Sequence, residues 1–263
     1  MSVRAQQYDA RVLRREQLSE HLVRIVLGGL DGFESTQIPD EWVGLVVPGQ
    51  FQSRYYTVRH WDGAEMTLDI VVHEVGLVTE WASRHDIVGE VVRISEPKGS
   101  FAPPDDAWWL YLVGDLTAAP AMARIAESID PAINVMVWVE APEPVEGYFA
   151  EALAGQGNLV WLRPAAEGSG LARWVESLPW PDGPGYFWMA GESAQMRAIR
   201  KHLMREVKLP TAYYDVMGYW RASTGRQPRA VDPGPIYRAG KAAGKSDAEI
   251  WADYDQAQQA AQQ

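Results

Sequence analysis

Apolar and polar residues alternate in short runs over the first hundred positions of the chain. Runs of this kind, separated by Gly and Pro, are typical of antiparallel strands with one buried face. The runs that we predict as strands cover residues 11–15, 21–27, 43–47, 52–59, 65–72 and 90–95. A short helix is predicted at residues 79–84. The number and spacing of these strands predict a small antiparallel barrel.

The pattern changes after a Pro-rich linker at residues 101–106. Continuous apolar strands at residues 108–113, 133–139, 159–162, 186–190 and 213–216 alternate with helical spacing at 117–128, 148–154, 171–178 and 193–207. This alternation predicts a parallel sheet with right-handed crossovers. We therefore expect an all-β domain at residues 1–103, an α/β domain at 104–217 and a C-terminal tail at 218–263. Within the tail, residues 247–261 can form a helix that Ser246 caps.

The composition excludes several kinds of site. The chain has no cysteine, so it cannot form disulfides, zinc–thiolate sites, protein-bound iron–sulfur clusters or a cysteine nucleophile. Its five histidines show no recognised metal-ligand spacing, and we expect no resident metal ion. The net charge of −11 argues against nucleic acid as a partner, because binding to phosphates needs a basic surface.

Hydropathy also bears on where the protein works. The first residues contain no apolar run of signal-peptide length, and no run approaches the roughly 18 apolar residues of a membrane-spanning helix. We expect a cytoplasmic protein without stable membrane insertion.

The most informative motif is Arg-Tyr-Tyr-Thr-Val-Arg at residues 54–59. Side chains alternate along a strand, so Arg54, Tyr56 and Val58 share one face while Thr57 and Arg59 share the other. A flavin needs a flat apolar surface for its ring, a hydrogen-bonding group near N5 and cations for its pyrophosphate. Tyr, Thr and Arg suit these three tasks. An exposed strand with paired charges is the alternative interpretation of the same residue types.

A second motif lies at residues 73–82, where a predicted strand ends at His73 and Gly76 permits a tight turn. Thr79 can cap a helix that starts there, and the N-terminus of a helix suits a pyrophosphate. An ordinary turn followed by a capped helix explains the same residues without a ligand.

Two further motifs lie where predicted parallel strands end, which is where open α/β sheets bind ligands. The first is Gly-Asp-Leu-Thr-Ala-Ala-Pro at residues 114–120, in which Asp115 or Thr117 can cap the next helix. The second is Ala-Gly-Glu-Ser at residues 190–193, whose small residues let a ligand approach the backbone. Helix caps and solvated charges can account for both motifs.

A fifth motif is Gly-Tyr-Trp-Arg at residues 218–221. Together the five motifs resemble those of the siderophore-interacting protein family. Members of this family are FAD-dependent ferric-siderophore reductases related to ferredoxin-reductase-like flavoproteins. Five motifs occur in the family's order between about residue 8 and residue 221. The chain departs from the family pattern at Leu77, where the family has proline, and in the spacing of glycine after Arg221. The resemblance implies an N-terminal Greek-key FAD-binding barrel and a C-terminal parallel-sheet domain that binds a nicotinamide cofactor.

The resemblance also implies which residues bind the cofactors. Those that it places on FAD are Arg54, Tyr56, Thr57, Val58, Arg59, His73, Val78, Thr79 and Trp81. Those that it places near adenosine, the nicotinamide cofactor or the domain seam are Asp115, Thr117, Ala118, Gly191, Glu192, Tyr219 and Trp220. In this arrangement Tyr56 packs on the flavin ring, Thr57 approaches N5, and Arg54 or Arg59 meets phosphate.

The activity that the resemblance implies is reduction of a ferric siderophore by NADH or NADPH through FAD, with release of Fe(II). We expect no catalytic side chain, because the flavin carries the redox chemistry. Ferric siderophores are often anionic, so Lys98, Arg84 and Arg221 are candidates for a basic rim, with ordinary surface cations as the alternative. Glu140, near the end of the second parallel strand, favours NADH unless it faces solvent.

Two other functions remain open at the level of sequence. One is a related flavin reductase that passes electrons to another acceptor, such as a quinone or an electron-transfer protein. The other is a protein that binds a siderophore without turnover.

Overall fold

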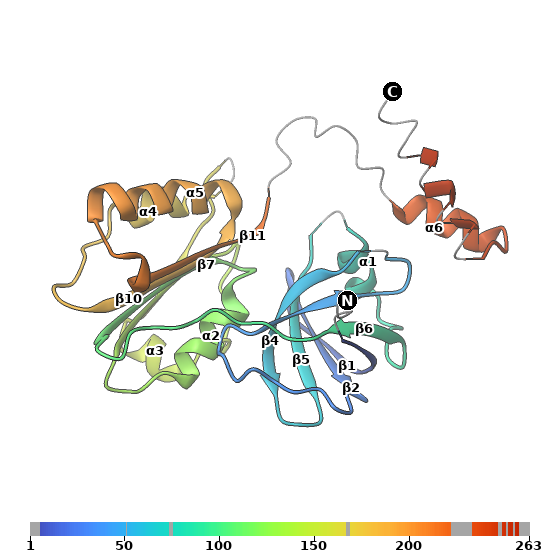
Figure 1. The fold of residues 1–263 in the computed structure, drawn as a ribbon, viewed down its shortest axis with the longest axis horizontal. Coiled ribbons are helices and arrows are strands. Elements are labelled where there is room, and N and C mark those ends of the chain that lie inside the picture. Colours follow the sequence, from blue (N-terminus) through green and yellow to red (C-terminus); the bar gives the residue numbers. More distant parts are fainter. Residues whose placement is uncertain are drawn as a thin grey trace, which may run out of the picture.

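The fold was analysed in a computed structural model, which describes residues 6–50, 52–73, 76–166, 169–221, 233–246, 249–250, 252–254 and 256–257. Its two main bodies are a barrel and a layered α/β unit, joined by the segment at residues 96–108 (Figure 1). Within the described residues, no helix combines the length and the apolar character needed to cross a bilayer.

The N-terminal body is a closed barrel with the strand order β1-β2-β5-β4-β3-β6. Its strands are β1 (Gln7–Ser19), β2 (Leu22–Gly28), β3 (Trp42–Val46), β4 (Arg54–Trp61), β5 (Met66–Val71) and β6 (Val91–Ser95). All neighbouring strands are antiparallel, which confirms the predicted barrel. Alternate side chains fill its interior with Val, Ile and Leu, as the period of two requires.

A short helix, α1 (Leu77–Ser83), follows β5. It starts two residues earlier than predicted, with Gly76 as the N-cap residue and no side-chain cap. Thr79 therefore lies inside the helix and does not cap it. Gly76 has φ +141°, a conformation that L side chains rarely adopt, so glycine is needed to make this turn.

The second body is a parallel sheet with the order β11-β10-β7-β8-β9. Its strands are β7 (Trp109–Asp115), β8 (Asn134–Glu140), β9 (Leu159–Leu162), β10 (Gly185–Glu192) and β11 (Tyr214–Trp220). The helices are α2 (Ala119–Ser128), α3 (Glu151–Gly155), α4 (Leu171–Glu176) and α5 (Ser193–His202). In Figure 1, α2 and α3 cover one face and α4 and α5 the other, and a separate apolar core fills each interface.

Three differences from the predicted elements concern the end of the chain. Strand β11 continues to Trp220, so the aromatic motif belongs to the sheet and not to the tail. Helix α5 ends at His202 and passes into a π-helical turn, Leu203–Val207, where a single helix was predicted. Helix α6 (Pro233–Ala242) was not predicted. The helix predicted at residues 247–261 lies partly outside the described residues.

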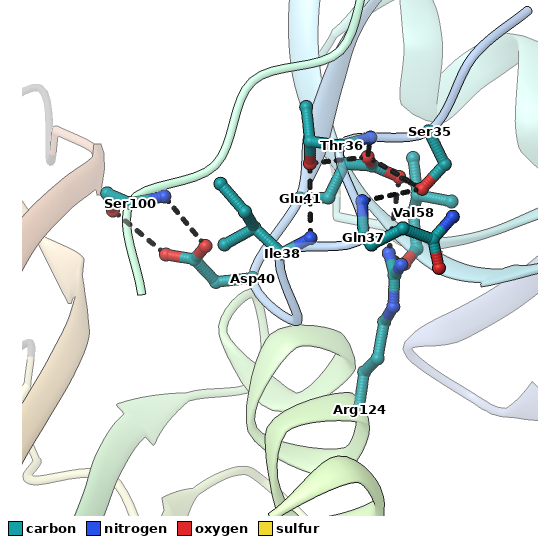
Figure 2. Close-up of polar contacts among 9 residues, drawn as sticks. All are labelled: Ser35, Thr36, Gln37, Ile38, Asp40, Glu41, Val58, Ser100 and Arg124. Atoms are coloured by element: carbon teal, nitrogen blue, oxygen red, sulfur yellow. Dashed lines mark hydrogen bonds and ion pairs between the residues drawn. The ribbon is translucent and has the colours of Figure 1, made fainter. Parts of the chain in front are cut away.

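Two consecutive carboxylates of the barrel hold the two bodies together, and both residues are fully buried. Asp40 accepts hydrogen bonds from the backbone N–H groups of Ser100 (2.8 Å) and Phe101 (2.9 Å) in the linker, and lies 3.4 Å from Nε1 of Trp188 on β10. Glu41 lies 3.4 Å from Nη1 of Arg124 on α2, as Figure 2 shows. These contacts fix where β4 lies relative to the parallel sheet.

Candidate functional site

The barrel side of the site is strand β4, which begins at Arg54. Pairing with β3 sets Tyr56 opposite Val43 and Thr57 opposite Trp42. Arg54 is exposed, whereas Tyr56 is half-buried and packs against the barrel core. Burial raises the pKa of Tyr56 to about 12, so its phenol stays neutral at physiological pH. The strand thus presents an exposed cation that forms no ion pair with the described residues, a neutral ring and, on its opposite face, Thr57.

Thr57 is 5% exposed and lies beside the side chain of Tyr219 from β11. Among the described residues, the buried hydroxyl of Tyr219 lies close to the Thr57 side chain but has no partner at full hydrogen-bond geometry. Burial raises the pKa of Tyr219, the nearby Asp40 adds to the effect, and the Thr57 side chain opposes it. A buried hydroxyl without a partner is rare in native proteins and is satisfied when a ligand supplies a polar atom. The two bodies therefore meet at a point that has unused hydrogen-bonding capacity.

Two residues of the β4 motif lie away from the contact between Thr57 and Tyr219. Val58 is fully buried in the barrel core. Arg59 lies against α2, where its Nη1 is 2.8 Å from Oε2 of Glu127 and its guanidinium lies 5.7 Å from the ring centroid of Tyr148. Because Glu127 neutralises this cation at the seam, Arg59 is not placed to meet a phosphate beside Arg54. Among the described residues Arg59 Nε is buried and unpartnered.

Of the residues predicted to bind FAD around α1, some lie at the surface and others pack into the barrel core. His73 is exposed, and a side chain at Gly76 would lie 3.7 Å from His73 Cε1 and 4.0 Å from Thr79 Oγ1. Val78 and Trp81 instead pack into the barrel core, and Trp81 Nε1 donates to Glu90 Oε2 at 2.8 Å. Their side chains stabilise the barrel and do not face the outer surface, although the sequence motif grouped them with His73 and Thr79.

On the sheet side, the carboxyl ends of β7, β10 and β11 meet around Asp115. Its carboxylate accepts hydrogen bonds from Thr117 N at 2.9 Å, from the Thr117 hydroxyl and from Trp220 Nε1 at 2.7 Å. Burial raises the pKa of Asp115. Gly191 has φ +151°, and a Cβ there would lie 2.5 Å from Asp115 Oδ2. Only glycine fits this close approach.

Neither predicted cap at the start of α2 is present. Ala118 is the N-cap residue, is fully buried and offers no side-chain acceptor. Asp115 bonds to Thr117 and does not cap the helix. At α5 the opposite holds, since Glu192 is the N-cap residue and accepts from Ala194 N at 2.6 Å and Gln195 N at 3.0 Å. Glu192 therefore fixes the turn between the end of β10 and the start of α5.

The three candidate cations for a basic rim differ in their availability. Arg84 is paired with Asp86 at 2.9 Å and with Glu90 at 2.7 Å, so its charge is neutralised. Lys98 and Arg221 are exposed and form no ion pair within the described part of the chain. Of the three cations that the sequence suggested for an anionic siderophore, Lys98 and Arg221 therefore remain candidates.

The sequence did not single out a cavity of about 350 Å³ at the ends of β8 and β9. Its lining includes Glu140, Arg163, Arg173 and Trp174. Glu140 is 6% exposed, so the alternative in which it faces solvent is wrong. An arginine directly after an apolar strand and an Arg-Trp pair in the next helix were the available signals.

The closed barrel followed by a five-stranded parallel sheet is a ferredoxin-reductase-like fold. A ferredoxin NADP+ reductase from Neisseria gonorrhoeae with bound FAD and NADP has the same fold, with a TM-score of 0.61 over 82% of this chain and all of that chain, at 13% identity.

The chain belongs to the siderophore-interacting protein family. The model of the siderophore-interacting FAD-binding domain matches residues 49–101, and that of the siderophore-interacting protein matches residues 107–223. A siderophore utilization protein from T. fusca is 26% identical, with a TM-score of 0.71 over 84% of this chain and 94% of that chain. An NADPH-dependent ferric-chelate reductase of Escherichia coli is 26% identical over 80% of this chain and 91% of its own length. These relatives support an oxidoreductase with an FAD-binding domain.

Proposed function

We propose that this protein is an FAD-containing reductase that uses NADH or NADPH to reduce the ferric iron of a siderophore. The proposal rests first on the meeting of Thr57 from the barrel with the hydroxyl of Tyr219 from the sheet, which has no partner at full hydrogen-bond geometry among the described residues. The FAD-binding domain of the family and the ferric-chelate reductase among the relatives support it. Ferric iron is the substrate, and its reduction to Fe(II) weakens binding by the siderophore.

The residues on the barrel side fit FAD. Arg54 is exposed and makes no ion pair within the described residues, so it is free to bind a pyrophosphate oxygen. Tyr56 supplies a neutral aromatic face, and Thr57 with Tyr219 supplies hydroxyl groups for the polar edge of the ring system. When bound, FAD accepts two electrons as hydride and returns them one at a time, so one NAD(P)H reduces two ferric ions.

The chain's own residues position and shield the reaction. Gly191 keeps the backbone open beside Asp115 at the carboxyl ends of the sheet, where a nicotinamide can approach the seam. Trp220 is held by Asp115 at 2.7 Å and is 41% exposed, so its indole covers this place from the solvent side. Lys98 and Arg221, which form no ion pair with the described residues, are the cations that we assign to an anionic ferric siderophore.

The decisive variant is Tyr219→Phe. In FAD-free protein the change removes an unpartnered buried hydroxyl, so we expect unchanged or higher thermal stability. In the presence of FAD we expect weaker cofactor affinity, measured by flavin fluorescence during titration. Unchanged affinity for FAD would remove the main structural support for the proposal. Arg54→Gln should lower FAD affinity by roughly tenfold, while Arg93→Gln, an exposed arginine on β6, serves as the matched control.

Turnover is tested by adding NADH or NADPH and a ferric siderophore to FAD-loaded protein in the presence of a ferrous-iron chelator. We expect bleaching of the flavin by the nicotinamide and formation of the coloured ferrous complex. Bleaching followed by electron transfer only to quinones or flavins would assign another acceptor. Failure to take up FAD, together with binding of the siderophore, would establish a non-catalytic binding protein.

A further inference from the structure

One serine hydroxyl of the linker lies between two carboxyl groups that belong to different bodies of the molecule. Ser100 Oγ is 2.9 Å from Asp40 Oδ2, in the loop before β3, and 2.6 Å from Asp215 Oδ2 on β11. Figure 2 shows the barrel side of this arrangement, where Ser100 bonds to Asp40. A serine hydroxyl carries one hydrogen, and an ionised carboxylate only accepts hydrogen bonds. Ser100 can therefore bond to both carboxyl groups only when one of them carries a proton.

The hydrogen bonds of Asp40 place that proton on Asp215. Oδ1 of Asp40 accepts from the N–H groups of Ser100 (2.8 Å) and Phe101 (2.9 Å). Oδ2 of Asp40 lies near Ser100 Oγ and 3.4 Å from Trp188 Nε1. A proton on either oxygen of Asp40 would point at a donor. Protonated Asp215 instead donates to Ser100 Oγ, and the Ser100 hydroxyl then donates to Asp40.

Charged and titratable side chains from several elements surround Asp215. They are Asp40 before β3, Arg200 on α5, Tyr186 on β10 and Tyr219 on β11. Burial raises the pKa of Asp215 and the charge of Asp40 raises it further, whereas the side-chain hydrogen bond and the positive charge of Arg200 oppose the shift. Burial also raises the pKa of both tyrosines, so they are uncharged. Asp215 therefore keeps its proton at pH values where an exposed aspartate is ionised.

Asp215 shares one face of β11 with Met217 and Tyr219, because side chains alternate along a strand. This face meets the linker and the barrel. Met217 Sδ lies 3.3 Å from Ser100 Oγ, and Tyr219 lies beside Thr57 on β4. A movement of β11 that separates Asp215 from Ser100 would therefore also move Tyr219 relative to Thr57.

We propose that Asp215 positions Tyr219 against Thr57, and that it does so through one proton shared with a carboxylate of the barrel. With the proton present, a continuous chain of hydrogen bonds runs from β11 through Ser100 to Asp40. When the proton leaves, two negative charges face one hydroxyl, so one carboxylate loses its donor and the two repel each other. The closed seam binds the proton more tightly than the open seam, so a rise in pH through the raised pKa of Asp215 favours opening. The inference deepens the proposed function, on which it relies for the link between Tyr219 and FAD.

The proton itself is observed by infrared spectroscopy of the full chain without FAD, at about pH 6, where exposed carboxyl groups are ionised. We expect a protonated-carboxyl band in the wild type that Asp215→Asn lacks. Asp105→Asn, which changes an exposed aspartate of the same linker, should retain the band. A difference spectrum between wild type and Asp215→Asn without this band would overturn the inference.

Hydrogen exchange of the linker peptide at residues 96–108, followed by mass spectrometry, measures opening of the seam. The amide of Asp215→Asn can donate to Ser100 at every pH, so this variant should exchange like the protonated wild type. Asp215→Ala cannot donate and should exchange at least about tenfold faster at about pH 5. Between about pH 5 and about pH 9, the wild-type rate divided by the Asp215→Asn rate should rise. Equal rates in the two variants, or a constant ratio across this range, would overturn the proton-dependent contact.

A fluorescence titration with FAD separates the inference from the proposed function. We expect weaker FAD binding by Asp215→Ala than by Asp215→Asn, because only the asparagine holds β11 against the linker. Faster exchange in Asp215→Ala with equal FAD affinity in both variants would refute the positioning of Tyr219. Equal exchange in both variants with normal FAD uptake would overturn the inference and leave the reductase intact. Protein that takes up no FAD, but shows the infrared band and the exchange difference, would refute the reductase and uphold the shared proton.

Discussion

The buried carboxylate of Glu41 provides a quantitative test of how the two bodies are joined. We compare Glu41→Ala with Arg124→Met, which remove the two ends of the contact that Figure 2 shows between the barrel and α2. If this ion pair carried most of the stabilisation, the two substitutions would cost similar free energies. The geometry predicts instead that the loss of Glu41 costs considerably more.

The difference follows from the hydrogen bonds of each group. Glu41 accepts from the Ser35 hydroxyl at 2.9 Å, the Thr36 hydroxyl at 2.6 Å and the Thr36 N–H, whereas Arg124 Nη1 lies 3.4 Å away. The strong contact of Arg124 is with the Val58 carbonyl at 2.7 Å. Removing Glu41 leaves the Ser35 and Thr36 donors without an acceptor and the partly buried Arg124 without its counter-charge, which costs about 3–5 kcal/mol. Removing Arg124 loses its hydrogen bond to Val58 and a distant counter-charge of Glu41, whose oxygens keep their Ser35 and Thr36 donors, and should cost about 1.5–3 kcal/mol.

Urea unfolding followed by both circular dichroism and tryptophan fluorescence measures these free energies. The two signals also reveal whether the barrel and the α/β unit unfold together, which the buried seam favours. Glu65→Ala is the control, because its pair with Arg14 is exposed and should contribute about 0–1 kcal/mol. A cost for Arg124→Met equal to or above that of Glu41→Ala would refute this account of the seam.

Further predictions concern three other residues. Arg59→Gln should leave the affinity for FAD unchanged in a fluorescence titration while lowering the free energy of unfolding, because Arg59 pairs with Glu127 and not with a phosphate. Gly191→Ala should destabilise the protein by about 1–3 kcal/mol in urea unfolding, since φ is +151° and the added methyl group would press on a buried carboxylate. Burial and the nearby Asp40 raise the pKa of Asp215, so the folded state binds its proton more tightly than the unfolded state does. Stability should therefore fall as pH rises from about 4 through the raised pKa of Asp215, and Asp215→Asn should remove that part of the slope in unfolding experiments between pH 4 and 7.

Local patterns were sufficient to predict the barrel and the parallel sheet. A strand buried on one face alternates apolar and polar residues, and a strand buried on both faces is a continuous apolar run. Local patterns were insufficient for α6, whose segment Pro-Gly-Pro at residues 233–235 is typical of a turn. Two contacts of this helix lie outside its own segment. Gly240 packs closely against the fully buried Ile250 ten positions on, since a Cβ there would lie 2.5 Å from it, and Arg238 pairs with the distant Glu80 on α1 at 2.8 Å.

The candidate site was predicted less completely than the fold, and Arg54 and Arg59 show why. Both arginines belong to one motif, and alternation along a strand assigns them to opposite faces. The function of each depends on what its face meets. Arg54 faces solvent, whereas Arg59 meets Glu127, which lies 68 positions away in the sequence. No local pattern contains that partner.

The contact between Thr57 and Tyr219 likewise exists only when the barrel and the parallel sheet are packed together. Thr57 lies on a barrel strand and Tyr219 on the last strand of the sheet, so their approach depends on the orientation of the two bodies. Asp40 sets this orientation through the linker N–H groups and Trp188. Within the described residues, the Tyr219 hydroxyl has no partner at full hydrogen-bond geometry, and this capacity is what we propose FAD uses at the seam. If FAD binds there, its site needs both bodies, and neither body alone should bind FAD with the affinity of the whole chain in a fluorescence titration.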